Sequence, residues 1–467
     1  MKTLKTIKKL PLLLLVVLLS FSCNDDDDDV IIVDEGSLNI VETAKAAGLN
    51  ILVDAATQAG LVDALTAAGD KTVLAPTDAA FTAFLADKGF NSLSEVPNAV
   101  LAQILLNHVI GGSNITSAAL AGKTGYTSTS ADGPNSAKLS LYYDGTSGVT
   151  FNGYSNVAIP DVETSNGIVH VVDAVIDLPT IVDHAIANTG FSSLVAALGA
   201  ADGDLVTLLS GAGTFTVLAP DDNAFATFLD GATLGDVPTD VLSQVLLNHV
   251  IGGAISSTDL VGLGNGYTNS SATGAGSNPM SIYFNTDDGV VFNGISKVML
   301  ADVVGTNGII HAVDAVIGLP TVVTFAVADP TFSTLVTALT ELTPETDFVS
   351  VLSTSDGTDP AAFTVFAPTN DAFDALDAIP GETVLTQVLL HHVVGGLNIQ
   401  SGNLQAGDNP ASTLQGQDII VTAPGSGDNI ANITDGAGST DSGIIAVDVQ
   451  ASNGVIHVIN KVLIPAL

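Results

Sequence analysis

The sequence of 467 residues contains no tryptophan, no arginine and a single cysteine. One cysteine excludes a disulfide framework, and the lack of tryptophan removes the largest aromatic platform on which sugars often stack. The basic side chains are 11 lysines against 49 aspartates and glutamates, which gives a net charge of −38. Such a charge repels phosphate backbones, so we expect no nucleic-acid partner.

The remaining composition is that of a folded chain. Hydrophobic residues make up 46% of the sequence, charged residues 13%, and the mean hydropathy is +0.47. A chain of this length predicts about three domains, each large enough to bury its own core. The excess of acidic residues mainly confers solubility, so by itself it predicts no metal site.

The first residues are typical of an export signal. Lys2, Lys5, Lys8 and Lys9 precede the apolar run from Leu10 to Phe21, which has the length of a signal-peptide core and is shorter than a membrane span. We therefore predict a signal peptide over residues 1–22. The segment from Ser20 to Cys23 resembles a bacterial lipoprotein box, in which the cysteine is lipidated, although Ser20 and Ser22 also fit an ordinary signal-peptidase site.

Residues 23–35 are predicted to form the lipidated cysteine and an acidic tether. Asp25 to Asp29 follow Cys23 almost directly, and a block of like charges repels itself and stays extended. Acidic residues in this position also resemble the surface-export signals of Bacteroidetes lipoproteins. The expected location is the outer membrane, with the chain held by its lipid and exposed on the cell surface.

Three blocks of sequence recur in the same order, which predicts three tandem domains. The second and third blocks each carry a histidine, and these two histidines are 62, 62 and 65 residues apart in the three copies. Prolines near 179 and 320 separate the copies and predict domains over residues 36–179, 180–320 and 321–467. The blocks are Thr72–Phe81, Thr216–Phe225 and Thr364–Phe373; then Leu105–Gly111, Leu246–Gly252 and Leu389–Gly395; then Asn166–Asp173, Asn307–Asp314 and Asn453–Asn460.

Each copy is predicted to have an α+β fold. Residues 72–75 read as a buried strand, after which Thr77 or Asp78 caps a helix. A second helix is predicted to begin after Pro97, to carry an apolar stripe as far as Val109, and to end at Gly111 and Gly112. The rest of the copy, through residue 176, is typical of antiparallel strands and turns.

These three blocks together resemble the fasciclin (FAS1) domain, three times over. The resemblance covers residues ~36–467. It implies a β-rich wedge or sandwich with several packed helices. It also implies adhesion to cells, extracellular matrix or polysaccharide, with no enzymatic activity.

Six histidines in the repeated blocks raise the question of a metal or catalytic site. The first of each copy lies on an apolar helical stripe and the second on a buried strand face. A pair of buried imidazoles without a nearby cysteine or glutamate makes a poor metal site, so we expect a structural role and no metal. These residues are His108, His170, His249, His311, His392 and His457.

The best candidate binding element is an Asp-Val pair that lies five residues before the closing Asn-Gly pair of each copy. It resembles the Asp-Ile loop to which integrin-directed adhesion is attributed in animal fasciclin proteins, and an exposed carboxylate beside an apolar side chain suits cation-bridged recognition. The alternative is a turn or strand-start residue. The candidates are Asp161, Val162, Asp302, Val303, Asp448 and Val449.

Three functions remain open from the sequence. We favour adhesion to a cell-surface or matrix polymer, protein or polysaccharide, with weak sites multiplied by tandem display. A carbohydrate-processing hydrolase would need two carboxylates about 5–10 Å apart in a cleft, and a structural spacer would need no site. No enzyme motif is present, and no cofactor is expected beyond a loosely bound Ca²⁺ at acidic clusters such as Asp287 and Asp288.

Overall fold

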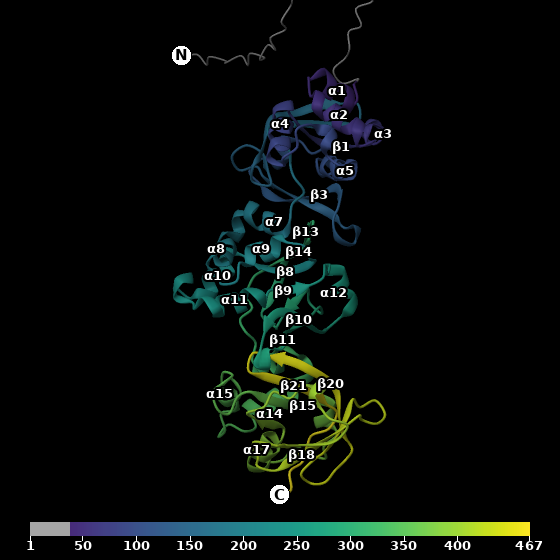
Figure 1. The fold of residues 1–467 in the computed structure, drawn as a ribbon. Coiled ribbons are helices and arrows are strands. Elements are labelled where there is room, and N and C mark those ends of the chain that lie inside the picture. Colours follow the sequence, from purple (N-terminus) through teal and green to yellow (C-terminus); the bar gives the residue numbers. More distant parts are fainter. Residues whose placement is uncertain (1–37) are drawn as a thin grey trace, which may run out of the picture.

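The computed structural model describes residues 38–467. The predicted signal peptide, Cys23 and the acidic tether lie outside the described residues. The described chain forms three β-rich domains that follow one another in sequence order along an elongated molecule, with α1 near one end and the C-terminus at the other (Figure 1).

Domain 1 contains a sheet of seven strands with helices packed against it. The strand order is β2-β1-β7-β6-β5-β4-β3, in which β1 pairs with β7 in parallel and the other neighbours are antiparallel. The helices are α1 (Ile40–Ala46), α2 (Asn50–Gln58), α3 (Val62–Thr66), α4 (Asp78–Asp87), α5 (Asn98–Asn107) and α6 (Ser117–Leu120). The strands are β1 (Lys71–Pro76), β2 (Val109–Gly111), β3 (Thr124–Asp132), β4 (Lys138–Asp144), β5 (Thr150–Phe151), β6 (Ser155–Thr164) and β7 (Gly167–Val172).

Domain 2 repeats this topology, and a bridge between β9 and β10 closes its strands into a barrel. Its helices are α7 (Ile181–Ala187), α8 (Ser192–Ala200), α9 (Leu205–Ser210), α10 (Asp222–Leu229), α11 (Thr239–Leu247) and α12 (Ser257–Leu263). Its strands are β8 (Phe215–Pro220), β9 (Val250–Gly252), β10 (Gly266–Thr273), β11 (Pro279–Asn285), β12 (Val291–Phe292), β13 (Ser296–Gly305) and β14 (Gly308–Val313).

Domain 3 keeps the seven-stranded order, with a 3-10 turn, η8 (Ser401–Asn403), after β16. Its helices are α13 (Val322–Ala328), α14 (Ser333–Thr340), α15 (Phe348–Leu352), α16 (Asn370–Asp374) and α17 (Glu382–His391). Its strands are β15 (Phe363–Pro368), β16 (Val393–Gly395), β17 (Gly407–Ser412), β18 (Asp418–Ala423), β19 (Ala431–Thr434), β20 (Ser442–Ala451) and β21 (Gly454–Ile459). The three domains confirm the predicted α+β class.

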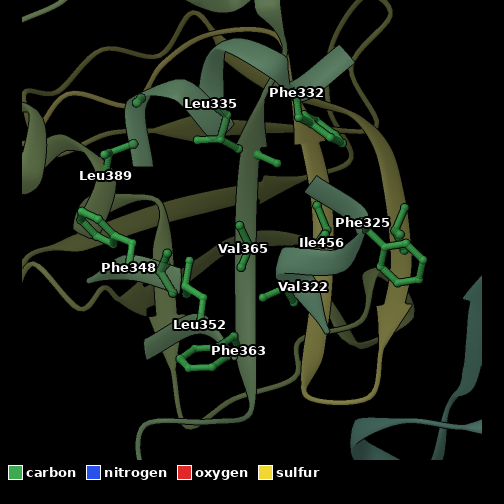
Figure 2. Packing of buried hydrophobic residues seen from close by; sticks show 14 of the residues in the cluster. Val322, Phe325, Phe332, Leu335, Phe348, Leu352, Phe363, Val365, Leu389 and Ile456 are labelled. Carbon is green, nitrogen blue, oxygen red and sulfur yellow. The ribbon is translucent and has the colours of Figure 1, made fainter. Parts of the chain in front are cut away.

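The main core of each domain lies between its first helices and the parallel strand pair. In domain 3, Phe332 and Leu335 from the helical segment belong to one buried cluster with Val365 of β15 and Ile456 of β21 (Figure 2). Both strands of the pair are almost wholly buried, which explains why the first and third sequence blocks read as continuous apolar runs.

The closing Asn-Gly pair fastens the first helix of each domain to the sheet. Asn166 Oδ1 accepts a hydrogen bond from the backbone N–H of Ile40 at 3.0 Å, and Asn166 Nδ2 donates to the carbonyl oxygen of Leu65 at 2.8 Å. A Cβ on Gly167 would lie 2.3 Å from the carbonyl oxygen of Lys71, so only glycine fits. The same bonds join Ile181 to Asn307 and Val322 to Asn453.

The helix of the second block ends earlier than its apolar stripe predicts. α5 stops at Asn107, and Val109 to Gly111 form β2, which pairs with β1. The prediction that the helix continues to Gly111 was therefore wrong. Pairing with an already buried strand satisfies the backbone of these residues, and this tertiary contact overrides the local helical pattern.

The histidine after that helix links its last turn to the chain that follows β7. His108 Nδ1 donates to the carbonyl oxygen of Ile104 at 2.8 Å, and Nε2 accepts from the N–H of Ile176 at 2.9 Å. His249 and His392 make the equivalent pairs of bonds. Burial lowers the pKa of all three imidazoles to about 4, so they are neutral at pH 7.

We expect these three histidines to make the protein sensitive to moderate acid. An unfolded histidine has a pKa of about 6.5, so between about pH 6.5 and 4 the unfolded chain binds more protons than the folded chain. Stability should be complete above about pH 6.5 and fall below it, by up to ~1.4 kcal/mol per pH unit for each histidine. Urea unfolding at a series of pH values measures this slope.

The control for this prediction is His249→Gln, which keeps a side-chain donor and acceptor but does not titrate. The variant should be less stable than the wild type at pH 7, and the difference should shrink toward pH 4. A difference that stays constant with pH would contradict the assignment.

Candidate binding loop and its supporting network

The aspartate of each Asp-Val pair lies at an irregularity in a long strand. The register between β6 and β7 shifts between Ile159 and Val162, and the same shift occurs in β13 and β20. Asp161, Asp302 and Asp448 have φ of 57°, 60° and 62°. Aspartate tolerates this left-handed conformation better than most residues, so the irregularity turns its carboxylate out of the strand.

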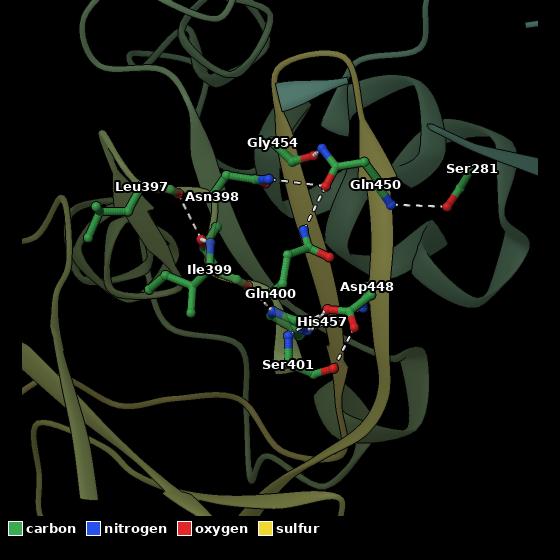
Figure 3. A network of polar contacts seen from close by, with 11 residues as sticks. Ser281, Leu397, Asn398, Ile399, Gln400, Ser401, Asp448, Gln450, Gly454 and His457 are labelled. Carbon is green, nitrogen blue, oxygen red and sulfur yellow. Dashed lines mark hydrogen bonds and ion pairs between the residues drawn. The ribbon is translucent and has the colours of Figure 1, made fainter. Parts of the chain in front are cut away.

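That carboxylate holds the segment that follows the second strand of the domain. Asp161 Oδ1 accepts from the N–H of Ser117 at 2.7 Å, and Oδ2 accepts from the Ser117 hydroxyl at 2.5 Å. Asp302 makes the same two bonds to Ser257, and Asp448 makes them to Ser401 (Figure 3). The aspartate therefore has a structural role in all three domains.

The second histidine of each domain completes the network. The N–H of Asp161 donates to His170 Nδ1 at 3.1 Å, which requires the proton of the imidazole to lie on Nε2. His170 Nε2 donates to the carbonyl oxygen of Ile115 at 2.8 Å. Equivalent bonds join His311 to Asp302 and Ile255, and His457 to Asp448 and Ile399.

The threonine of the first block fixes the same segment from its other side. Thr72 Oγ1 donates to the carbonyl oxygen of Ser113 and accepts from the N–H of Ile115. Thr216 and Thr364 do the same in the other domains. The network thus joins the first block, the third block and the aspartate loop, which explains why these residue types recur together.

Serine, aspartate and histidine meet at this point without forming a catalytic triad. A triad needs the serine hydroxyl to donate to an imidazole that acts as its base. Here the Ser117 hydroxyl donates to Asp161, and both nitrogens of His170 are occupied by backbone groups. The arrangement gives the serine no base, so it supports a structural function of these side chains.

The aspartates keep part of their surface available. The side chain of Asp161 is 35% exposed and that of Asp448 is 31% exposed. Burial alone would raise the pKa of the Asp161 carboxyl, but its hydrogen bonds with Ser117 lower the pKa below the usual value. The group is therefore ionised at neutral pH and can accept a ligand on its free side.

The valines of the Asp-Val pairs are not exposed beside the aspartates, as binding through both side chains would require. Val303 and Val449 are buried and Val162 is half-buried. The exposed apolar side chains near the aspartates instead precede them: Ile159 (55% exposed), Met299 (67%), Leu300 (41%) and Ile445 (41%). Sequence reasoning missed these residues, although each lies two or three positions before its aspartate.

The acidic cluster considered for Ca²⁺ lies in the turn between β11 and β12. Asp287 Oδ2 accepts from the side-chain amides of Asn265 and Asn285, and Asp288 is fully exposed, with Oδ2 3.9 Å from Lys297 Nζ. No group of three or more histidine, cysteine, aspartate or glutamate side chains within residues 38–467 is arranged to hold a metal ion.

The apolar helices are short in the part of the chain that the structure describes. No single helix there is long and apolar enough to cross a membrane. Two pairs of helices, each bent sharply between its members, together reach the length and apolar composition of a membrane span. One pair covers residues 181–200 and the other residues 322–340.

Comparison with known proteins identifies the family. The fasciclin domain model matches residues 47–179, 189–320 and 330–465, so the chain belongs to the fasciclin family. It is 28% identical to human periostin over 333 residues, which are 68% of this chain and 35% of periostin. It is 36% identical to protein sll1483 of Synechocystis over 156 residues, which are 32% of this chain and 74% of that protein.

Among solved structures, the chain is similar to a FAS1 domain pair from the insect cell adhesion molecule fasciclin I. The TM-score is 0.39 and the identity 18%, over 59% of this chain and 98% of the pair. The matched region spans about a third of periostin. The family membership supports a role in adhesion or surface binding.

The network predicts losses of stability of different size for two substitutions of Asp161. Asp161→Ala removes both acceptors from Ser117 and places a poorly tolerated residue at positive φ, so it should destabilise domain 1 by about 2–3 kcal/mol. Asp161→Asn keeps an acceptor for the Ser117 N–H and tolerates the same φ, so the loss should stay under about 1 kcal/mol. Thermal and urea unfolding compare the two. Equal losses would contradict the network.

Proposed function

We propose that the chain is an adhesion protein whose three aspartate loops bind a cell-surface or extracellular polymer. The observation that carries this proposal is the recurrence, in all three domains, of a half-exposed carboxylate held in a fixed geometry beside exposed apolar side chains. Rigid placement lowers the entropic cost of recognition, and the apolar neighbours add contact area.

The partner is a protein or polysaccharide of the cell surface or matrix. A carboxylate with its outer oxygen lone pairs free suits a cation bridge, in which Ca²⁺ joins it to an acidic or hydroxyl-rich ligand. This arrangement also fits the net charge of −38, because an anionic partner would otherwise be repelled. Three copies multiply weak individual contacts into useful avidity.

The spacer function is the second candidate, and one observation favours it. Each aspartate already has a structural partner in Ser117, Ser257 or Ser401. If that is the whole role of the aspartate, the array only extends another component outward. The binding experiment below distinguishes the two functions.

Substitution of all three aspartates by asparagine tests the adhesion function. In the soluble chain of residues 24–467, Asp161→Asn, Asp302→Asn and Asp448→Asn should preserve the fold and reduce saturable, Ca²⁺-dependent binding to the organism's own cells and polysaccharide at least about tenfold. Binding is measured with Ca²⁺ and with a chelator. Unchanged binding would move the site elsewhere, and absence of binding by the wild type would favour the spacer.

The matched control removes the same three charges at exposed positions, one in each domain. Asp63→Asn, Asp240→Asn and Asp377→Asn change residues that are exposed on helices or loops. This control should bind as the wild type does. If both triple variants lose binding equally, the net charge and not the loops would be responsible.

Attachment through Cys23 is the other part of the proposal. Lipidation at this residue would hold the array on the outer membrane, with the acidic tether as spacer. Cys23→Ala should abolish incorporation of labelled fatty acid and move the protein from the membrane fraction to the soluble fraction. Retention in the membrane fraction without the label would contradict lipid anchoring.

A further inference from the structure

The two domain junctions are built in the same way. A hairpin of one domain docks against a strand pair and the first helix of the next: β3–β4 lies against β13 and α7, and β10–β11 lies against β20 and α13 (Figure 1). At the centre of the first junction, the hydroxyl of Ser140 accepts a hydrogen bond from the N–H of Val304 at 3.0 Å. Ser281 accepts from Gln450 at 3.0 Å in the second (Figure 3).

A pair of tyrosines contributes to the apolar contact in each junction. Tyr126 packs on Tyr142 with ring centroids 5.1 Å apart and meets the edge of His184 from the next domain. In the second junction, Tyr267 packs on Tyr283 and meets Phe325 in the same way. Tyr267 also donates to the carboxylate of Asp329 at 2.9 Å.

The tip of each docking hairpin enters the junction so closely that it requires glycine. A Cβ on Gly133 would lie 2.8 Å from Val304 Cγ1, and a Cβ on Gly274 would lie 2.2 Å from the carbonyl oxygen of Ala451. Side-chain amides add bonds across the junctions, from Asn135 to the carbonyl of Ala254 and from Asn398 to that of Ala275.

Domain 3 lacks this tip on the corresponding hairpin. A hydroxyl marks the base of the tip in each domain: Thr129 bonds to the carbonyl of Leu139, Ser270 to Met280 and Thr413 to Gln417. The separations are therefore ten, ten and four residues. The β17–β18 hairpin is six residues shorter and lacks the segment that contacts the next domain in domains 1 and 2.

Strand register identifies the residues that replace the tyrosines and the serine. The core pairs Tyr143–Phe151, Phe284–Phe292 and Val421–Ile433 are equivalent. At the position one residue before the first member of each pair, Ile420 of domain 3 stands where the other domains have Tyr142 and Tyr283. Its cross-strand partner, Pro410, stands where they have Tyr126 and Tyr267. Three residues earlier, the exposed Asp418 replaces the serine that accepts the junction hydrogen bond.

Domain 1 differs from domains 2 and 3 at the position that accepts the docking hairpin of the preceding domain. Glu163 pairs with Ile168 as Val304 pairs with Ile309 and Gln450 with Val455. Glu163 is exposed, whereas Val304 and Gln450 are buried in the junctions. If a second copy docked head to tail, Asp418 would lie against Glu163 at the point where Ser140 lies against Val304.

We propose that the exposed Glu163 of domain 1 and the short β17–β18 hairpin of domain 3 prevent head-to-tail association with a second copy of the chain, so that the chain is monomeric. A repeated head-to-tail contact between copies generates a ring if its rotation closes and an open filament if it does not. A proline on the outer strand and like charges at the contact are means by which proteins protect exposed sheet edges. Loss of the hairpin tip removes the attractive contacts as well.

Restoring a junction at the free end tests the proposal. In the chain of residues 24–467, residues 409–422 are replaced by the β10–β11 hairpin, residues 266–285, and Glu163 is changed to Val. Sedimentation velocity should show the wild type as a monomer over a wide concentration range and the chimera as a concentration-dependent series of oligomers. The chimera that keeps Glu163 should associate at least about tenfold more weakly, because the buried carboxylate opposes docking.

A second variant tests the proposal if the chimera does not fold. It keeps the short hairpin and restores the side chains alone, with Pro410→Tyr, Asp418→Ser, Ile420→Tyr and Glu163→Val. Circular dichroism establishes folding, and weak concentration-dependent dimerisation is expected. Association of the wild type through these ends, or strictly monomeric behaviour of every folded variant, would overturn the proposal.

Discussion

The close approach of the Asn-Gly pair to the first strand is the contact on which each domain depends. Because Gly167 has no Cβ, the start of β7 can lie against the carbonyl of Lys71 and pair in parallel with β1. The adjacent Asn166 then bonds to both the first and the third helical segments. A side chain at the glycine would separate the two central strands, and the hydrogen bonds from Asn166 to the helical segments would be lost.

The aspartate loop depends on the same pairing. β6 can place Asp161 at an irregularity only because β7 holds its register on both sides, and His170 of β7 accepts the N–H of that aspartate. Hydrogen bonds within the domain therefore hold the loop in one conformation. One carboxylate is thus a structural support and, in the proposed function, also the recognition site: two donors of Ser117 occupy its inner side, and the side chain is 35% exposed.

The sequence was sufficient to predict the family, the repeats and the α+β class. The same contacts occur in all three domains and require the same residue types, so these residues recur at the same places in each copy. It was insufficient where distant pairing decides the structure. Val109 to Gly111 continue a helical pattern but join a sheet. Asp161 and Val162 are neighbours in sequence, yet the register shift turns the valine inward and leaves Ile159 exposed. The partner of the aspartate, Ser117, lies 44 residues earlier, and no local pattern indicates it.

The junctions make the surroundings of the aspartate loop in domain 1 different from those in domains 2 and 3. Val304 and Gln450 lie two residues after Asp302 and Asp448, and each is held by a serine of the preceding domain. The loops of domains 2 and 3 are thus supported from both sides, whereas the loop of domain 1 has an exposed Glu163 at that position. Three copies of one loop therefore have two environments.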